Sequence, residues 1–149
     1  MSNWGKWGEF VKELWDQFEI TAHPKNAGHA RARIRTLAIS AGFADLDLGD
    51  IEIATGEALT NGILYGSPDS VSRIQITCSF TENSLCIEIR DQGSGFDPVR
   101  VPEDVAADAL GGRGICLMRA LMDHVELHYD GKGMVARLSK TLHTKRVHG

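Results

Sequence analysis

The stretch Asp91-Gln92-Gly93-Ser94-Gly95-Phe96 directly follows residues 85–90, in which apolar and polar side chains alternate. Strict alternation is typical of a half-buried strand, so the aspartate is expected at a strand end. An aspartate there can accept a hydrogen bond from an exocyclic amine, and glycines let the backbone approach a flat base or a phosphate closely. Alone, such a stretch is more often an ordinary acidic, glycine-rich turn, so its meaning depends on its surroundings.

Residues 74–80 alternate in the same way, and the short link to residues 85–90 predicts an antiparallel hairpin. A second hairpin is predicted from residues 125–129 and 134–140, which are joined by Asp130-Gly131-Lys132-Gly133. Apolar residues at steps of three and four predict helices elsewhere. The first covers about residues 24–41 and the third residues 114–123. The second has Asp47 or Asp50 as its N-terminal cap and reaches residue 65. This order, with a short strand at residues 18–22, predicts an α/β two-layer sandwich with a mainly antiparallel sheet.

The first 18 residues form a distinct segment that contains all three tryptophans. Apolar residues recur there at three- and four-residue steps, which predicts an amphipathic helix. They are Trp4, Trp7, Val11, Leu14, Trp15 and Phe18. The opposite face carries charges of both signs, so packing on this domain is favoured over packing on a partner chain, and both over a membrane surface. The predicted organisation is a helix over residues 1–17, one domain over 18–142 and a polar tail over 143–149.

Composition indicates an ordinary globular domain of 149 residues with a formal net charge of −4. That charge gives no basic field to attract nucleic acid directly. No apolar run is long enough to span a membrane, and no secretion signal is recognisable. The three cysteines form no CxxC pair, which is typical of reduced thiols and favours a cytoplasmic location.

Two further clusters resemble parts of a nucleotide site. Glu57 and Asn61 stand four residues apart, so they share a helix face and could hold a hydrated Mg²⁺, although such a pair is more often just a solvated surface. The sequence Gly111-Gly112-Arg113-Gly114-Ile115 precedes a predicted helix, where backbone N–H groups and the helix dipole favour an anion. A flexible loop is the ordinary alternative. Neither a P-loop nor a Rossmann glycine fingerprint is present.

The order of the three clusters resembles that of the GHKL, or Bergerat-fold, ATPases. The resemblance covers about residues 18–141 and implies a sheet covered by helices on one face. Within that superfamily, residues 91–97 and the Leu-Met-x-x-Leu-Met-Asp pattern at residues 117–123 look most like the bacterial anti-sigma-factor serine/threonine kinases. The resemblance therefore implies an ATP- and Mg²⁺-dependent protein kinase.

The resemblance also implies roles for individual residues. Glu57 would be the general base, and Asn61 would ligate Mg²⁺. Asp91 would read the adenine amino group. Residues 96–112 would form a lid over the phosphates. The remaining nucleotide-binding positions would be Gly93, Gly95, Gly111, Gly112, Arg113, Gly114 and Ile115. The implied partners are a STAS-type anti-anti-sigma protein as substrate, a sigma factor that is sequestered, and a second copy in a homodimer.

Two positions depart from the family pattern. Tyr65 stands where many relatives have histidine, and Met134 stands where many have a threonine that supports the adenine-reading aspartate. A methionine side chain cannot donate a hydrogen bond, so weaker nucleotide binding is expected. Two alternatives therefore remain: a catalytically inactive ATP-binding module that regulates a partner, and the ATP-binding domain of a two-component histidine kinase.

Overall fold

A computed structural model describes residues 13–92 and 112–143 of the chain. Its strands are β1 (Leu14–Thr21), β2 (Arg73–Thr81), β3 (Ser84–Arg90), β4 (His124–Tyr129) and β5 (Met134–Thr141). Its α-helices are α1 (Ala27–Ala41), α2 (Asp45–Thr60) and α4 (Gly112–Leu121). A short 3₁₀ turn, η2 (Pro24–Asn26), precedes α1, and a π-helical segment, η3 (Asn61–Gly66), continues α2.

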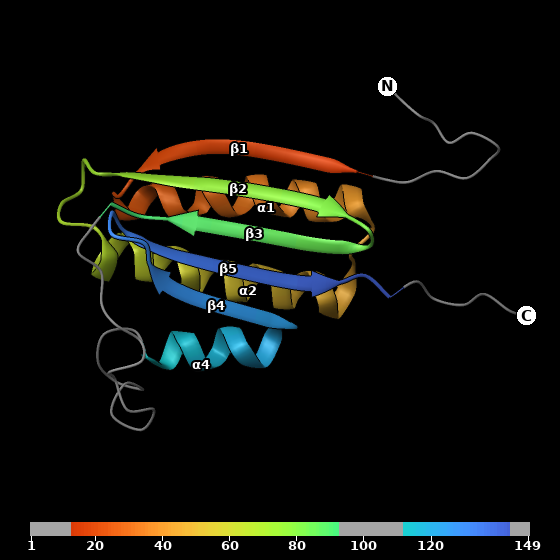
Figure 1. Cartoon of the computed structure of the whole chain (residues 1–149). Helices are drawn as coiled ribbons and strands as arrows, with labels where there is room; N and C mark the ends of the chain where they lie inside the picture. The colour runs from red at the N-terminus through yellow and green to blue at the C-terminus, as the bar shows by residue number, and fades with distance from the viewer. Residues whose placement is uncertain (1–12, 93–111, 144–149) are drawn as a thin grey trace, which may run out of the picture.

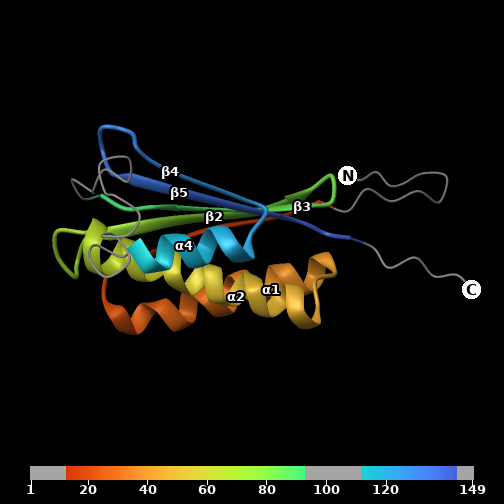
Figure 2. The same cartoon turned by 90° about the horizontal axis from the view of Figure 1, so that it is seen from below.

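The strands form one five-stranded sheet in the order β1-β2-β3-β5-β4, with every neighbouring pair antiparallel (Figure 1). The three α-helices lie on one face of this sheet (Figure 2). The helix α2 lies between α1 and α4 and contacts both. The predicted α/β two-layer architecture is therefore confirmed.

Alternation along the strands explains the core between the two layers. In β2 the side chains of Ile74, Ile76, Cys78 and Phe80 are buried, while their sequence neighbours are not. Helix α1 contributes Ala30, Ile34 and Leu37 at the expected helical spacing. It ends at Gly42, whose φ of 115° is the left-handed conformation that favours glycine at a helix C-terminus. In the described residues, no helix is long and apolar enough to cross a bilayer.

The predicted N-terminal helix is wrong for residues 14–17, which belong to strand β1 together with residues 18–21 of the predicted short strand. Leu14 pairs with Phe80 and Phe18 with Ile76, so β1 extends the sheet at the edge of β2. The alternate residues of β1 turn toward the helices, and Trp15 on the other face is 66% exposed. A short apolar pattern can satisfy a period of two as well as a helical period, and here the hydrogen-bonding edge of β2 decides between them. Residues 1–12 lie outside the described residues.

The helix boundaries also differ in detail from those predicted. Helix α2 begins at Asp45 after Ala44, so neither Asp47 nor Asp50 is its capping residue. Asp47 instead lies in the first turn, where a carboxylate interacts favourably with the helix dipole. Helix α4 begins at Gly112 rather than Gly114.

Candidate functional site

The side chains of Glu57 and Asn61 lie at the point where α2 changes into η3. Asn61 is the first residue of the π-helical segment. Wide helical turns of this kind are rare and often occur at functional sites. Glu57 is half-buried, whereas Asn61 is only 7% exposed. The α2–η3 junction therefore presents one carboxylate near the surface and one carboxamide in the interior.

The buried carboxamide of Asn61 has an unsatisfied atom. Among the described residues, nothing forms a hydrogen bond with its Nδ2. Buried polar groups are nearly always paired, and the orientation of an amide is assigned from its partners. A buried amide lacking a partner is what is expected where a bound group completes its coordination. The unpaired Nδ2 is a hydrogen-bond donor, which suits an acceptor oxygen such as that of a phosphate or a metal-bound water, whereas Oδ1 of the same carboxamide is the atom that could ligate Mg²⁺.

The carboxylate of Asp91 is held just after the end of β3, the central strand of the sheet. It is 4% exposed. Its backbone N–H donates to the carbonyl oxygen of Met134 at 3.0 Å, and its Oδ1 accepts the N–H of Met134 at 2.9 Å. The carboxylate is thus fixed by the first residue of β5. The backbone N–H of Met134 supports Asp91, while its side chain adds no second donor.

Two glycines, Gly66 after the predicted central helix and Gly133 in the predicted turn, closely approach Asp91. A Cβ added to Gly66 would overlap Oδ2 of Asp91 and lie 2.6 Å from its Cγ. A Cβ added to Gly133 would lie 2.7 Å from the carbonyl carbon of Asp91 and 3.1 Å from its Oδ1. Real Cβ atoms essentially never approach so closely. Both positions therefore require glycine for Asp91 to keep its place.

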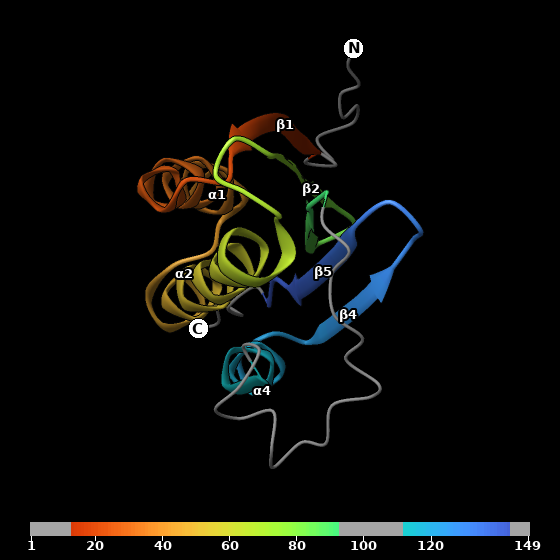
Figure 3. The same ribbon diagram turned by 90° about the vertical axis from the view of Figure 1, so that its left-hand side faces the viewer.

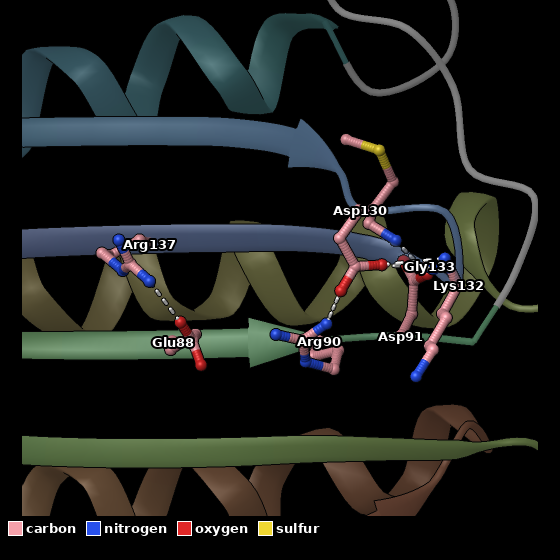
Figure 4. A network of polar contacts seen from close by, with 8 residues as sticks. Glu88, Arg90, Asp91, Asp130, Lys132, Gly133 and Arg137 are labelled. Atoms are coloured by element: carbon pink, nitrogen blue, oxygen red, sulfur yellow. Dashed lines mark hydrogen bonds and ion pairs between the residues drawn. The ribbon is translucent and has the colours of Figure 1, made fainter.

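The β4–β5 turn that delivers Met134 is itself fixed by a polar network (Figure 4). Oδ1 of Asp130 accepts the backbone N–H groups of Lys132 and Gly133 at 2.9 and 3.0 Å. Its Oδ2 forms an ion pair with Arg90, the last residue of β3. Because Arg90 immediately precedes Asp91, this network ties together the two strands that position the carboxylate.

A pocket lies between the α2–η3 helix and strands β3, β4 and β5. Figure 3 looks at this end of the sheet and shows the helix beside β5, with α4 farther along. The lining residues are mostly apolar: Ala58, Asn61, Gly62, Ile89, Asp91, Leu127, Met134 and Ala136. The pocket measures about 20 Å³, the space of one water, so its apolar walls and single fixed carboxylate form one side of a site for a molecule that presents an N–H donor.

The first turn of α4 lies against Glu57. A Cβ added to Gly114 would lie 2.6 Å from Oε1 of Glu57 and 3.5 Å from its Cβ. The glycine therefore allows the carboxylate to approach the start of the helix. Free N–H groups at a helix N-terminus are well suited to bind an anion such as a phosphate.

Some predicted site residues are not tested by this geometry. Gly93, Gly95 and Gly111 lie outside the described residues. Gly112 begins α4 and Arg113 follows it, but the side chain of Arg113 also lies outside what the structure describes. The side chain of Ile115 is 7% exposed and packs in the hydrophobic core, so only its backbone could contact a ligand.

The C-terminal end of α4 explains part of the Leu-Met-x-x-Leu-Met-Asp pattern. Met118 and Met122 are buried in the core. Asp123 then accepts the N–H of Thr141 at 2.7 Å through its carboxylate and donates its own N–H to Ser139 at 2.9 Å. Nζ of Lys140 donates to the carbonyl of Leu121 at 2.6 Å. These bonds anchor α4 to β5 and so position its N-terminal turn.

The two glycines inside the predicted central helix also have neighbours. Gly62 lies against the side chains of Ile74 and Ile89, so it allows close approach of the sheet. Gly56 lies against the side chain of Arg31 on α1. Tyr65 is 44% exposed and does not line the pocket beside Asp91.

Similarity to known proteins agrees with this arrangement. Residues 20–140 match the family described as "Histidine kinase-like ATPase domain". The serine-protein kinase RsbW of Listeria innocua is 29% identical over 139 residues, which cover 87% of this chain and 88% of the relative. The serine-protein kinase RsbW of Bacillus licheniformis is 29% identical over 150 residues, which cover 92% of each chain.

The similarity to solved structures concerns the fold alone. A crystal structure of RsbU and RsbW domains from Mycobacterium tuberculosis matches with a TM-score of 0.64 at 19% identity, over 85% of this chain and 32% of that one. A histidine kinase domain from a blue-light activated kinase of Erythrobacter litoralis matches with a TM-score of 0.53 at 18% identity, over 83% and 62% of the two chains. The resemblance to the GHKL ATPases is thereby confirmed, and because the family match spans nearly the whole described fold, this chain belongs to the histidine kinase-like ATPase domain family.

Proposed function

We propose that this protein is a protein serine/threonine kinase that uses Mg·ATP. The observation that carries the proposal is the convergence of a buried carboxylate, a buried carboxamide with an unpaired atom, and a helix N-terminus next to a second carboxylate. Family membership supports ATP as the nucleotide. Similarity to the RsbW serine-protein kinases supports serine as the acceptor.

Each proposed role follows from the chemistry of its residue. Asp91 would accept a hydrogen bond from the adenine amino group inside the apolar pocket. Asn61 would hold Mg²⁺, which would supply charge neutralisation between the phosphates. The N–H groups of Gly112 and Gly114 would bind phosphate oxygens at the start of α4, and Arg113 would add positive charge.

Glu57 would act as the general base. Its side chain lies against the phosphate-binding end of α4, so it is near the place where a phosphate and an incoming hydroxyl would meet. A base in that position orients the partner's serine and accepts its proton, which typically contributes about 10²–10⁴-fold to the rate.

The proposed substrate is a STAS-type anti-anti-sigma protein, and the competing partner is a sigma factor. Phosphorylation of the first would release this protein to sequester the second, as a cytoplasmic homodimer. Support for these partners is the likeness to RsbW proteins and the family motifs at residues 91–97 and 117–123.

The test combines binding and transfer. Calorimetry of Mg·ATP on the wild type, Asn61→Ala and Asp91→Ala should show that the first variant loses the Mg²⁺ dependence and the second loses nucleotide binding. Transfer of the γ-phosphate from labelled ATP to STAS proteins encoded by the same genome should then disappear in Glu57→Ala, which still binds ATP. Binding by the wild type without transfer to any such protein would instead indicate a regulatory ATP-binding module, and no binding at all would refute both.

A further inference from the structure

We infer that the tryptophan-rich N-terminal segment, residues 1–12, docks in a groove at the end of the sheet opposite the nucleotide site. This inference goes beyond the proposed function and does not depend on it. It accounts for the sequence feature that no catalytic role explains, namely the concentration of Trp4 and Trp7 just before the first strand.

The groove lies between the α1–α2 connection and the end of the sheet where the β2–β3 turn and the two residues after β5 meet. Its volume is about 650 Å³. Ligand pockets are typically about 300–1,000 Å³, so this space can receive more than one large side chain. Its apolar lining includes Phe80 and Leu142 on the sheet side and Leu46 on the first turn of α2.

Leu46 is the strongest sign that the described groove is incomplete. Its side chain is 83% exposed, the largest exposure among the large apolar residues of the described ranges. An isolated exposed leucine needs no explanation, but this one borders an apolar hollow with Phe80 beneath it. A segment seated in the groove would cover Leu46 together with the exposed part of Leu142.

Chain connectivity favours the N-terminal segment as the occupant. Leu14, the first residue of β1, pairs with Phe80, which lines the groove. Paired residues on antiparallel strands have Cα atoms about 4.5–5.5 Å apart, so the segment joins the fold at the mouth of the groove. Twelve residues can extend about 40 Å, so reach is no constraint, and the short tether gives a high effective concentration.

The charges also match. Asp45 and Asp47 line the groove beside Leu46. Residues 1–12 contain Lys6 and Lys12 against a single acidic residue, Glu9. Aromatic side chains with two flanking lysines therefore fit an apolar groove with a rim of two carboxylates.

Tryptophan fluorescence tests the inference directly, because the chain contains only three tryptophans. Trp15→Phe, a change at an exposed side chain, leaves Trp4 and Trp7 as the only reporters. In this background, acrylamide should quench the fluorescence several-fold less efficiently than it quenches a synthetic peptide of residues 1–12. Adding Leu46→Glu should raise quenching to the value of the peptide.

Val71→Glu is the matched control. Val71 is also an exposed apolar residue, at 74%, and it lies just before β2, at the opposite end of the sheet. This variant should leave the quenching unchanged. Quenching of the parent as efficient as that of the free peptide, or equal quenching in the Leu46→Glu and parent proteins, would overturn the inference.

Two further arms identify other occupants. If the protection from quenching disappears on dilution, the groove binds the segment of a second copy. If the protection requires an added partner protein or lipid vesicles, the segment binds elsewhere. Each result overturns docking within one chain. If far-UV circular dichroism shows that Leu46→Glu is unfolded, the double change Trp4→Ser and Trp7→Ser tests the same contact. It should shift the methyl resonances of Leu46 and Leu142 but not those of Val71, and unchanged spectra would refute the inference.

Discussion

Gly66→Ala tests whether a fixed Asp91 carboxylate is what binds the nucleotide. Gly66 ends η3 and lies directly against this carboxylate. The added Cβ would lie 2.6 Å from Cγ of Asp91, whereas ordinary contacts begin near 3.4 Å. Cγ must therefore retreat by about 0.8 Å, and Oδ2, which the Cβ would overlap, must move farther.

That displacement has a calculable cost for binding. The bond from the Met134 N–H to Oδ1 of Asp91 is 2.9 Å long, and a shift of this size takes it beyond the normal range of hydrogen bonds. Loss of a hydrogen bond to a charged group costs about 1.5–3 kcal/mol, which corresponds to a loss of affinity of about 10- to 150-fold if binding needs the carboxylate in its present position. The overpacking itself should lower the free energy of unfolding by about 1–3 kcal/mol.

Calorimetry with Mg·ATP and thermal unfolding separate the two effects. The matched control is Gly49→Ala on α2, because no atom of the described residues lies within 4 Å of the Cβ that it would add. This control should keep wild-type affinity and gain about 0.5–1 kcal/mol of stability from helix propensity. If Gly66→Ala folds and binds Mg·ATP as tightly as the control, then Asp91 does not need its observed position, and the proposed mode of adenine recognition is wrong.

Three further predictions concern other parts of the structure. Gly114→Ala would place a Cβ 2.6 Å from Oε1 of Glu57, so phosphoryl transfer should fall by about 10²-fold in a turnover assay, with a much smaller change in the Kd for ATP. Asp130→Ala removes the acceptor of two turn N–H groups and an ion pair, so calorimetry should show about tenfold weaker ATP binding; unchanged affinity would contradict the positioning role of the turn. Burial raises the pKa of the Cys78 thiol to about 12, so at pH 8 only about one molecule in 10⁴ carries the thiolate. Peptide mapping after iodoacetamide treatment should therefore find the exposed Cys116 modified, whereas Cys78 should stay unmodified until the protein unfolds.

The strands and helices of the core could be predicted from the sequence because their periods are unambiguous. β2 and β3 each alternate over several residues, and the link between them is too short for anything but a hairpin. The segment before Phe18 could not be assigned in the same way. Its apolar residues satisfy a helical period, yet residues 14–21 form a strand because the edge of β2 offers hydrogen bonds and a core to cover. Pairing with a distant strand leaves no local signal.

The candidate site was only partly predictable for a similar reason. Motif spacing selected Glu57, Asn61 and Asp91 as candidates, because their chemistry is visible in the residue type. It did not identify Gly66 or Gly133, because their importance lies in the distance to a side chain that is remote along the chain. Glycines next to a helix end or in a turn have an adequate local explanation, and only the folded geometry shows the second constraint.

Met134 shows how a departure from a family pattern can be compatible with the same geometry. Its side chain cannot donate a hydrogen bond, and the sequence alone therefore argues for a poorly supported aspartate. The pairing of β3 with β5 places the N–H of this residue on Asp91, and any non-proline residue at that position provides the same donor. The side chain is then available for another purpose and forms part of the apolar wall of the pocket. Substitution at this position should consequently alter the shape of the pocket more than the orientation of the carboxylate, while the missing side-chain donor keeps weaker nucleotide binding the expectation.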